Sequence, residues 1–376
     1  MIYLDYSATT PINFEVLDTY NKTSKDFFGN PNSLHELGVK TKSLMNSATK
    51  QIAEILGINE SEITYTGGAT QANNIAIIGA AMHNHKKGHH IIVSKLEHPS
   101  IYAICNYLEN LGFEISYVNN DEDGLIDFEN LKHLIRTDTI LVSICAVNSE
   151  LGIRQPLKMI RQIIKKENPN TILHSDMTQA IGKVSVSMHD VDLATFTAHK
   201  IYGPKGIGIL YKSNNIGISP ILFGSGKSNM LNPGTPAVPL IVSLSKALRL
   251  ATTDLEKRER FIERLNLKIV DALKKYNGVM INKTKYSIPH ILNISLRNIK
   301  AETFLHALEE YEIYVSSNTA CSSATLSSSV MAVYNDQVRA SSTLRISLSH
   351  LTTTDEVNKF INYFDQIYRK LSGLHN

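Results

Sequence analysis

The chain has 376 residues, of which 43% are hydrophobic and 19% are charged, and its formal net charge is +3. This composition excludes an intrinsically disordered chain, and a small charge without long basic or acidic blocks excludes a strong field for nucleic acids or anionic membranes. A chain of this length can bury a large core and form two domains that share a cleft.

The N-terminus and the cysteines bear on the compartment. The first residues, MIYLDYSATTP, show no basic stretch followed by an apolar stretch, and no later segment is long and apolar enough to cross a bilayer. Only three cysteines occur, Cys105, Cys145 and Cys321, and they lie far apart. This favours free thiols over a disulfide framework, so we expect a cytoplasmic protein. The surroundings of Cys105 and Cys145 are apolar, which predicts that both are small core residues.

Short apolar, β-branched runs alternate with amphipathic stretches through the first two thirds of the chain. The runs that we expect to be strands are HIIVSKL (90–96), FEISYVN (113–119), TILVSICAV (139–147), TILHSD (171–176), LATFTAHK (193–200) and GIGILYK (206–212). Their alternation with helical patterns favours an α/β fold with a mainly parallel central sheet.

A second, smaller α+β domain is expected towards the C-terminus. Residues 240–276 are periodic and charged on one face, which predicts one long helix that leaves the first domain. Strands at 290–296 and 344–350 then alternate with helices near 301–311 and 354–371. We predict a large domain of residues 16–250 and a small domain formed by residues 1–15 and 251–376.

Two polar segments are expected to be loops. The run from Ser316 to Ser329 is rich in serine, which predicts a mobile loop rather than a strand or a core helix. The segment HNHKKGHH, from His83 to His90, lacks the spacing of a zinc motif, and we interpret it as a solvated connection between a helix and a strand. No metal site is predicted.

The candidate chemistry lies in the middle of the predicted sheet. Asp176 ends one predicted strand and Lys200 follows the next, and side chains at the C-terminal ends of such strands converge on one crevice. A lysine that forms a Schiff base and an acid that keeps a pyridine nitrogen protonated suit pyridoxal 5'-phosphate. Taken alone, the same pair also fits an ordinary salt bridge.

A glycine turn adds a candidate phosphate site. The segment TYTGGATQANNIAIIGAAM, which starts at Thr64, is typical of a strand, a turn and a helix, so backbone N–H groups and the Thr70 hydroxyl could meet a phosphate. Taken alone, a Gly-Gly turn that opens a helix is more often a tight connection. The later GPKGIG lacks the spacing of a Walker motif and is not interpreted as a nucleotide site.

These segments, in this order, resemble the cysteine desulfurases of the class V aminotransferase family, of the NifS and IscS type. The segments that carry the resemblance are LDYSATTP (Leu4), NPNSLHELG (Asn30), the glycine turn, LEHPS (Leu96), VNSELGIRQP (Val147), SDMTQ (Ser175), TAHKIYGPKGIG (Thr197), NPGTPAVPL (Asn232), SSNTACSS (Ser316) and LRISLSHLTTTDEV (Leu344). The resemblance implies fold type I of the pyridoxal-phosphate enzymes, with a mainly parallel seven-stranded sheet in the large domain and a smaller α+β domain.

The resemblance also assigns cofactor contacts. It implies that Lys200 forms the Schiff base, that Asp176 pairs with the pyridine nitrogen and that His98 stacks on the ring and can pass protons. It places the remaining contacts on the phosphate and the phenolic oxygen, at Ala69, Thr70, Gln179, Thr197 and His199. Without the resemblance, a helix-capping or core histidine before Pro99 is the favoured interpretation of His98.

The substrate and sulfur roles come from the same resemblance. Arg345 would clamp the substrate carboxylate with its planar fork, and Asn148 would help to hold the same end. Cys321, in the serine-rich segment, would take sulfur from L-cysteine as a persulfide and leave alanine. A lone arginine in LRISL is otherwise a surface or salt-bridge residue.

The pattern departs from the family in the segment GSGKSNMLNPGT. Lys227 and Ser228 stand at a usual Gln-Glu or His-Glu pair, and Asn229 and Asn232 stand at two usual arginines. Gln71 replaces a usual glutamate, and Ser149 replaces the second asparagine of a usual Asn-Asn-Glu. Thr235 is kept and would reach the phosphate of a neighbouring subunit, which implies a homodimer with shared sites.

The resemblance further implies a protein sulfur acceptor, such as an iron-sulfur scaffold or a tRNA-thiolation enzyme, and no direct contact with nucleic acid. Two alternatives remain open at this point. One is an aminotransferase or β-lyase of the same fold in which Cys321 is only a loop residue. The other is a cofactor-binding scaffold without turnover.

Overall fold

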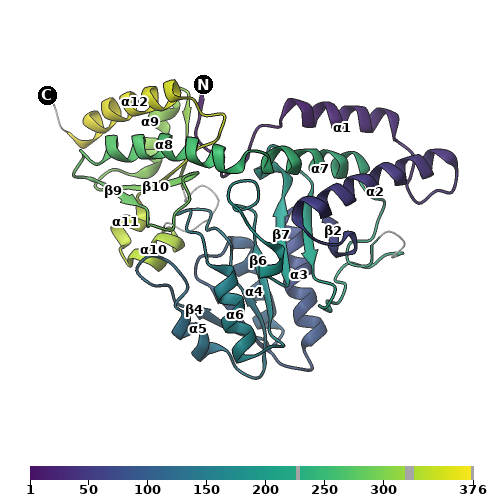
Figure 1. Ribbon diagram of the computed structural model, residues 1–376. Coiled ribbons are helices and arrows are strands. Elements are labelled where there is room, and N and C mark those ends of the chain that lie inside the picture. Colours follow the sequence, from purple (N-terminus) through teal and green to yellow (C-terminus); the bar gives the residue numbers. More distant parts are fainter. Residues whose placement is uncertain (226–228, 318–325, 374–376) are drawn as a thin grey trace.

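The computed structural model describes residues 1–225, 229–317 and 326–373 (Figure 1). A seven-stranded sheet forms the centre of its larger part, in the order β2-β8-β7-β6-β5-β3-β4. Neighbouring strands are parallel, except that β8 runs antiparallel to both β2 and β7. The strands are β2 (Ile63–Thr66), β3 (His90–Ser94), β4 (Glu114–Val118), β5 (Thr139–Ser143), β6 (Ile172–Asp176), β7 (Leu193–Thr197) and β8 (Gly208–Lys212). The predicted mainly parallel sheet is confirmed.

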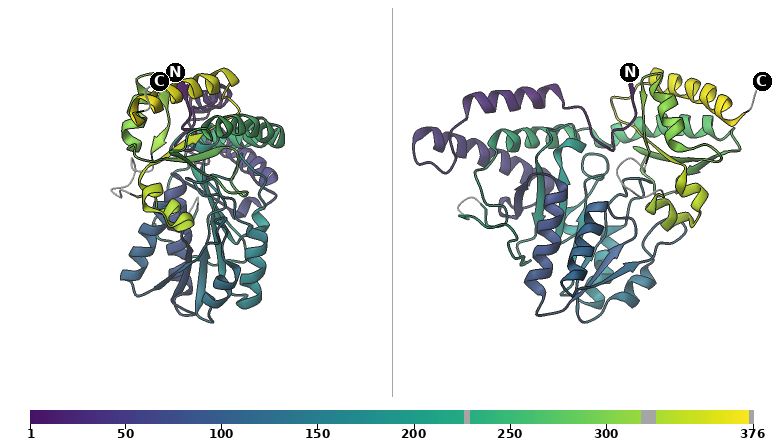
Figure 2. Two further views of the ribbon diagram at one scale, coloured as in Figure 1. Left: turned by 90° about the vertical axis from the view of Figure 1, so that its left-hand side faces the viewer. Right: turned by 180° about the vertical axis from the view of Figure 1, so that it is seen from behind.

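Helices cover both faces of this sheet, which the left view of Figure 2 shows edge-on. One face packs against α3 (Ala69–Asn84) and α4 (Pro99–Asn110), in a core that includes Ile75 and Ile104. The other face packs against α2 (Glu36–Leu56), α5 (Phe128–Leu134), α6 (Leu157–Glu167) and α7 (Val238–Thr252). Three of the central strands, β5, β6 and β7, are buried along their whole length, as expected for parallel strands covered on both faces.

The C-terminal part of the chain builds a second, smaller sheet. Four antiparallel strands lie in the order β12-β13-β10-β9, and β1 (Ile2–Tyr3) pairs in parallel with β11 (Ile313–Tyr314). The other strands are β9 (Val279–Asn282), β10 (Ile291–Leu296), β12 (Ser316–Ser317) and β13 (Thr343–Ser347), and the helices of this part are α8 (Leu255–Leu273), α9 (Ala301–Glu309), α10 (Ser328–Tyr334), α11 (Gln337–Ser341) and α12 (Thr354–Ser372).

The N-terminus belongs to the core of this smaller part. Ile2 and Leu4 are buried in one cluster with Phe304 of α9 and Phe364 of α12, whose rings lie 4.8 Å apart. The first residues of the chain therefore bridge to its last third, and they bring the segment after β1 to the large sheet. The exact domain boundaries at residues 16 and 250 stay a prediction.

The prediction of one long helix over residues 240–276 is wrong, because the structure has two helices there, α7 and α8. Thr253 has an extended backbone, and Asp254 has a left-handed backbone with φ 55°. Threonine and aspartate are weak helix formers, and aspartate tolerates the left-handed region better than most residues do. The charge periodicity continues across the break, which is why the pattern predicts one helix.

The two predicted loops are only partly loops. Ser316 and Ser317 form β12, and Ser328 and Ser329 begin α10, whose N-cap is Ser327, so the expectation of a loop is wrong at both ends of that run. Residues 318–325 lie outside the described residues.

The histidine segment is divided in a similar way. His83 lies in the last turn of α3, whereas His90 is buried in β3 and bonds to Thr139 and Ser116 at 2.7 and 2.9 Å. Within the described ranges, the structure holds no group of three or more potential metal ligands. None of the described helices combines the length and the apolar character that crossing a bilayer requires.

Candidate active site

A cavity of about 1070 Å³ lies where the C-terminal ends of the large sheet's strands meet the smaller sheet. Its wall contains Asp176 at the end of β6, Lys200 after β7, and residues from the loop after β1. Arg345 of β13 closes it from the other side. The structure therefore brings Asp176, Lys200 and Arg345, which are far apart in the sequence, to one pocket.

Asp176 is held rigidly at the base of the cavity. Its residue is 7% exposed, and one carboxylate oxygen, Oδ2, accepts from Nδ2 of Asn73 at 2.9 Å. The other oxygen accepts from the backbone N–H of Thr178 at 2.9 Å. Both carboxylate oxygens therefore accept from N–H donors, and these two bonds fix the orientation of the carboxylate.

The Lys200 amine is directed by the loop after β1. Its Nζ donates to the carbonyl oxygens of Ser7 and Ala8 at 2.6 and 2.5 Å. Lys200 ends the short 3-10 turn Ala198–Lys200 that follows β7, so the backbone places the amine at the strand edge. The nearby Lys183 is buried, donates to Oε1 of Gln179 and does not line the cavity.

The glycine turn opens α3 onto the cavity. Gly68 is the N-cap of α3 and has φ 148°, a backbone conformation that L residues with a side chain rarely adopt. Ala69 and Thr70, in the first turn, line the cavity, and Thr70 is exposed to it. The N-terminus of a helix with free N–H groups and a positive dipole end is suited to a phosphate.

Packing behind the turn leaves no room for a side chain on β8. A Cβ at Gly208 would lie 2.8 Å from the carbonyl carbon of Gly68 and 2.7 Å from the carbonyl oxygen of Phe196. The first residue of β8 therefore sits directly between the glycine turn and the end of β7.

The other predicted cofactor residues also lie on this wall. Thr197 is buried and donates to the carbonyl of Ile207 at 3.0 Å. The amide of Gln179 donates to the carbonyl of Ser7 at 2.9 Å. His199 bonds to the Thr9 hydroxyl at 3.1 Å, and removal from water together with the cation of Lys200 lowers the pKa of His199 to about 4. His199 is therefore neutral near pH 7.

His98 is both a helix cap and part of the cavity wall. It is the N-cap of α4, and its Nδ1 accepts from the backbone N–H of Ser100 at 3.2 Å. The capping interpretation is thus confirmed, and His98 also lies in the cavity wall, while its contact with a cofactor ring stays a prediction. Removal from water is the main cause that lowers the pKa of His98. The negative charge of Asp176 raises this pKa in part, and the positive charge of Lys200 lowers it further.

Arg345 is fixed by two contacts from different parts of the chain. One nitrogen, Nη1, donates to the carbonyl of Ser149 at 3.1 Å, and Nη2 lies 3.1 Å from a carboxylate oxygen of Asp5. Its Nε is buried and has no hydrogen-bond partner among the described residues. The guanidinium thus keeps unused donors at the cavity wall.

Two predicted residues lie outside the cavity wall, and a third falls outside the described residues. Asn148 is buried, and its amide donates to the carbonyl of Leu96 at 2.9 Å and to Oγ of Ser329 at 3.0 Å, so a substrate contact would require these bonds to be exchanged. Thr235 is exposed and outside the cavity lining. Cys321 lies outside the described residues.

The structure adds contacts that the sequence did not single out. Ser7 and Ala8 hold Lys200, Asn73 holds Asp176, and Asp5 holds Arg345. Glu97 is buried beside the backbone N–H of Cys145, which donates to it at 2.6 Å, and burial raises the pKa of Glu97 to about 8. The motif LDYSATTP, which contains Ser7 and Ala8, pointed to this segment as part of the site. Its contact with Lys200 could not be predicted, because that contact depends on the N-terminus crossing between the two sheets.

The residues present fit pyridoxal phosphate. Ser7 Oγ and Thr178 Oγ1 are buried and, like Arg345 Nε, have no hydrogen-bond partner in the described part of the chain, as expected where a polar ligand completes the wall. The α3 N-terminus, which suits an anion, the Lys200 amine and the buried Asp176 carboxylate all line the same cavity. This is the donor set that a phosphorylated pyridine aldehyde needs.

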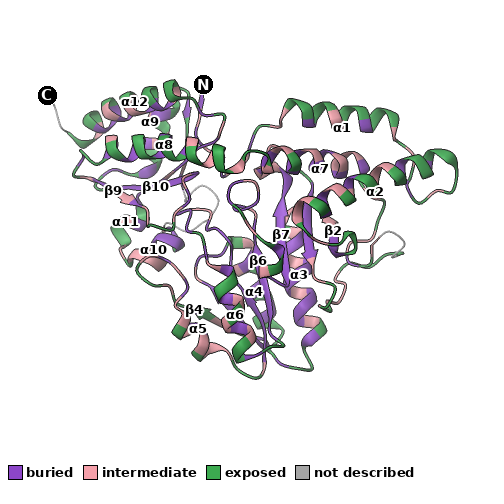
Figure 3. Ribbon diagram, viewed as in Figure 1, coloured by how far each residue is buried: buried purple, intermediate pink, exposed green. Residues whose placement is uncertain are grey.

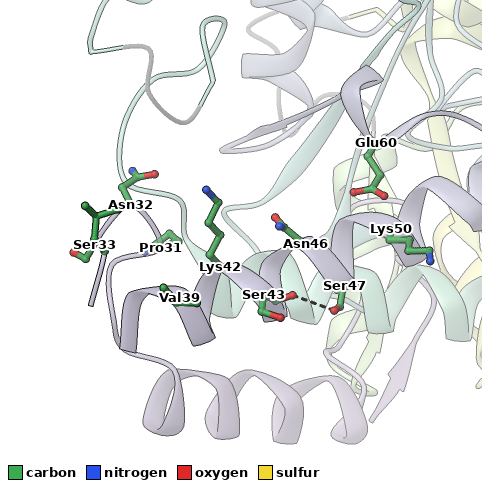
Figure 4. Close-up of a pocket in the computed structure, with 11 residues that line it drawn as sticks. Pro31, Asn32, Ser33, Val39, Lys42, Ser43, Asn46, Ser47, Lys50 and Glu60 are labelled. Carbon is green, nitrogen blue, oxygen red and sulfur yellow. Dashed lines mark hydrogen bonds between the residues drawn. The ribbon is translucent and has the colours of Figure 1, made fainter. Parts of the chain in front are cut away.

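A smaller hollow of about 470 Å³ lies along α2 and shares no lining residue with the cavity (Figure 4). Its wall combines Pro31 and Val39 with the charged ends of Lys42, Lys50 and Glu60. None of the predicted cofactor or substrate residues lies there.

Comparison with known proteins gives the same picture for the whole chain. The family described as aminotransferase class-V matches residues 2–360. A NifS/IcsS protein homolog of Lactobacillus delbrueckii subsp. bulgaricus is 38% identical and covers 100% of this chain and 99% of its own. Cysteine desulfurase IscS of Dictyoglomus turgidum is 36% identical, over 98% of this chain and 95% of its own. A solved structure named NifS-like protein is 34% identical and superposes with a TM-score of 0.92, covering 99% of this chain and 100% of its own. This chain belongs to the class V aminotransferase family, among its NifS- and IscS-type members.

Proposed function

We propose that this chain is a pyridoxal-phosphate-dependent cysteine desulfurase, which converts L-cysteine to L-alanine and passes the sulfur to Cys321 as a persulfide. The observation that carries the proposal is the convergence of Lys200, Asp176 and the α3 N-terminus on one cavity. The name of the Dictyoglomus turgidum relative, a cysteine desulfurase, supports L-cysteine as the substrate.

The cofactor is assigned to the residues that line the cavity. Thr70, Ala69 and the N–H groups of the α3 N-terminus would hold the phosphate, with Thr197 and His199 on the same wall. Asp176 would meet the ring nitrogen and Gln179 the phenolic oxygen. When bound, pyridoxal phosphate supplies an electron sink that weakens bonds at the substrate Cα and Cβ.

Substrate orientation is assigned to Arg345. The guanidinium is fixed by Asp5 and the carbonyl of Ser149, and its remaining donors match the two oxygens of an amino-acid carboxylate. Arg345 is mostly withdrawn from water, with 12% of its side chain exposed, so such a bond is stronger than one at the surface.

Proton transfer is assigned to Lys200 and His98. The Lys200 amine, once released from the carbonyls of Ser7 and Ala8, can take a proton from the substrate Cα. His98 is kept neutral by its surroundings and caps α4 through Nδ1, so its Nε2 carries the proton that it can deliver.

Cys321 is assigned to sulfur transfer. Its thiolate forms an S–S bond to the substrate sulfur, the Cβ–S bond breaks, and the electron pair stays on Cβ, which takes a proton to become the methyl group of alanine. Sulfur is oxidised and Cβ is reduced in one step, so no external oxidant is needed. Ser316, Ser317, Leu326 and Ser327 line the cavity, so the segment that carries Cys321 begins and ends at the cavity wall.

The C-terminal end of that segment, at Ser327, is fixed by hydrogen bonds. Ser327 caps α10 through the N–H of Val330 and also donates to Glu150 at 2.5 Å. Asn148 holds Ser329 of the same helix. Cys321 is four residues from Ser317, and a fully extended chain of that length spans at most about 14 Å, so the proposal requires sulfur transfer within that reach of Ser317.

The test is the reaction of purified, cofactor-loaded protein with L-cysteine and a reductant. We expect equal amounts of alanine and sulfide from the natural chain. Cys321→Ala should abolish sulfide release but keep the cofactor absorbance, whereas Cys105→Ala should keep both. Alanine and sulfide production that survives in Cys321→Ala would exclude the thiol from the mechanism, and the absence of turnover in the natural chain would exclude the function.

A homodimer with shared sites is part of the proposal. Helix α1 (Phe14–Asp26) and the start of α2 project from the large sheet, and their outer faces are exposed (Figure 3). Exposed apolar side chains gather in this arm and in the segment before Thr235, namely Phe14, Phe28, Leu34, Phe223 and Met230. Such exposure favours burial against a second copy. Thr235, which is exposed outside its own cavity, would then reach the partner's phosphate.

Mixing two defective variants tests the sharing of sites. A heterodimer of Lys200→Ala and Thr235→Ala contains one site with both residues intact, so a mixture refolded together should regain up to about a quarter of the natural sites. No gain over the separate variants, in a mixture shown by sedimentation to be dimeric, would exclude the contribution of Thr235 across the interface.

The persulfide is proposed to go to a protein acceptor, such as an iron-sulfur scaffold or a tRNA-thiolation enzyme. The two cysteines in the described residues, Cys105 and Cys145, are free thiols, which supports the proposal of a cytoplasmic, reducing compartment.

A further inference from the structure

A buried amide lies between Asp176, which is assigned to the nitrogen of the cofactor ring, and the start of α4, where His98 is assigned to its face. Asn73 of α3 is 0% exposed, and its Nδ2 donates to Oδ2 of Asp176 at 2.9 Å. The same nitrogen donates to Oγ of Ser100 at 3.2 Å. Its oxygen, Oδ1, accepts from the hydroxyl of Thr195 at 2.5 Å. All the donors and the acceptor of this side chain are thus directed at other side chains from three separate elements, β6, α4 and β7.

The direction of the amide is determined by its neighbours. An ionised carboxylate can only accept, so the group that faces Asp176 must be the NH₂ of Asn73. Thr195 is paired in register with Asp176 on the adjacent strand, and its hydroxyl occupies the amide oxygen. Thr195 therefore keeps Asn73 from turning its oxygen towards the carboxylate, where two acceptors would repel each other.

The link from Asn73 continues to His98. Because Oγ of Ser100 accepts from Asn73, its single proton is available for Nδ1 of His98, which lies 2.9 Å away. Nδ1 also accepts from the backbone N–H of Ser100 at 3.2 Å. A nitrogen that accepts twice carries no proton in the neutral ring, so the proton of neutral His98 lies on Nε2.

We propose that Asn73 is a positioning residue that fixes the carboxylate of Asp176 and, by directing the hydroxyl proton of Ser100 towards Nδ1, adds a second donor that holds the ring of His98. This inference rests on the proposed function, since it gives the buried amide a role only if Asp176 and His98 act on a bound ring. Its consequence is that one side chain links the acid assigned to the ring nitrogen with the histidine assigned to the ring face, in addition to the backbone donors that hold each of them.

The first test is Asn73→Ala, with Asn84→Ala as the matched control. Asn84 is a buried asparagine of the same helix, but its amide donates only to the carbonyl of Ala80 within that helix. Loss of one hydrogen bond to a charged group predicts a fall in kcat of about 10- to 100-fold for Asn73→Ala. The dissociation constant for pyridoxal phosphate, measured by fluorescence on reconstitution of the apoprotein, should rise roughly tenfold. Asn84→Ala should change neither value.

Two further variants distinguish positioning from a general loss of structure. Thr195→Val keeps Asn73 but removes the donor that orients its amide, and we expect a smaller fall in kcat, about 3- to 10-fold. Ser100→Ala should lower kcat in the natural background, but it should add less than about twofold to the loss in Asn73→Ala, because the link is already broken. The pH at which the cofactor absorbance changes should move in Asn73→Ala and stay in place in Asn84→Ala.

The outcomes separate this inference from the proposed function. If the natural chain binds the cofactor and releases sulfide, but Asn73→Ala keeps the affinity and the pH profile of Asn84→Ala, the positioning role is excluded and the function stands. Multiplicative losses in the Ser100 and Asn73 double variant would likewise exclude the coupling. If Asn73→Ala does not fold, Thr195→Val decides alone, since unchanged cofactor affinity and pH profile in that variant would overturn the proposal.

Discussion

The carboxylate of Asp5 lies 3.1 Å from Nη2 of Arg345, which joins the N-terminal segment to β13 at the wall of the cavity. Both side chains are mostly withdrawn from water, with 12% exposure for Arg345 and 19% for Asp5. Burial raises the pKa of Asp5, and the guanidinium of Arg345 opposes this rise. The surrounding structure therefore fixes the positions of both side chains, unlike those of an ion pair at the surface.

Asp5→Asn should weaken substrate binding. The amide keeps the shape of the carboxylate but not its charge, so Arg345 loses its charge-assisted bond, and we expect KM for L-cysteine to rise about 5- to 10-fold with a smaller change in kcat. Asp123→Asn is the control, because Asp123 pairs with Lys285 at a site that shares no residue with the cavity. A lower KM in Asp5→Asn would mean that Asp5 competes with the substrate for Arg345.

Arg345→Lys should reduce the preference of the enzyme for a substrate that carries a carboxylate. A lysine keeps the charge but offers no planar pair of donors, so KM for L-cysteine should rise at least about tenfold. Cysteamine lacks the carboxylate, and its weak binding, measured as inhibition, should be the same in the variant and the natural chain. Equal effects on both compounds would remove Arg345 from carboxylate binding.

Lys200→Ala should abolish covalent retention of the cofactor. Borohydride treatment should fix pyridoxal phosphate to Lys200 in the natural chain, as detected by mass spectrometry of peptides, and should leave no label in the variant. Lys212→Ala is a control on β8, where the amine donates to the carbonyls of Ser213 and Ile216 outside the cavity. A label that moves to Lys183 would assign the chemistry to the other buried lysine.

Acid should destabilise the protein through its buried histidines. Burial lowers the pKa of His174 from 6.5 to about 4 and that of His290 from 6.5 to about 3. The unfolded chain therefore binds more protons than the folded chain below pH 6.5, so stability falls as the pH drops towards those values, by about 1.4 kcal/mol per pH unit for each histidine.

The measurement is the urea midpoint of the apoprotein at pH 7, 6 and 5. His290→Gln should flatten the fall in the midpoint between pH 7 and 5, even if it lowers the midpoint at pH 7. A natural chain whose midpoint is constant over this range would contradict the assignment of neutral buried histidines.

The break between α7 and α8 predicts a stabilising substitution. Asp254 adopts φ 55°, and its side chain makes no capping hydrogen bond to α8. Glycine populates this region without the steric cost of a Cβ, so Asp254→Gly should raise the free energy of unfolding by about 0.5 to 1 kcal/mol. Thr253→Gly, one residue earlier in an extended backbone, should lower it. A loss of stability in Asp254→Gly would show that the aspartate holds the break by other means.

The local patterns of this chain predict the fold well where each pattern is decided by near neighbours. The strands at 172–176 and 193–197 are buried along their whole length, and the short runs of apolar and β-branched residues that start near Ile172 and Leu193 predict them. The prediction from periodicity is wrong at Thr253 and Asp254. The helical spacing of charged residues continues across the break, whereas the break itself depends only on the backbone angles of these two residues. The prediction of a loop is also wrong at Ser316 and Ser317, where pairing with β13 overrides the loop preference of serine.

For the site, the sequence predicts the residues but not their partners. Asp176, Lys200 and the glycine turn follow from strand ends, whereas the hold of Ser7 and Ala8 on Lys200 spans more than 190 residues and depends on β1 joining β11. Asn148 illustrates the opposite case, because its position matched a motif while its amide is occupied by Leu96 and Ser329.

The reversed strand β8 has a consequence for which ligands the enzyme accepts. Because Gly208 leaves no space between the glycine turn and Phe196, two strand spacings, roughly 10 Å, separate the anion cradle from the end of β7. This span is built from backbone alone and cannot stretch or shrink without breaking the ladder. The backbone ladder, rather than any side chain, therefore fixes the distance between the two groups that the proposed cofactor would have to span.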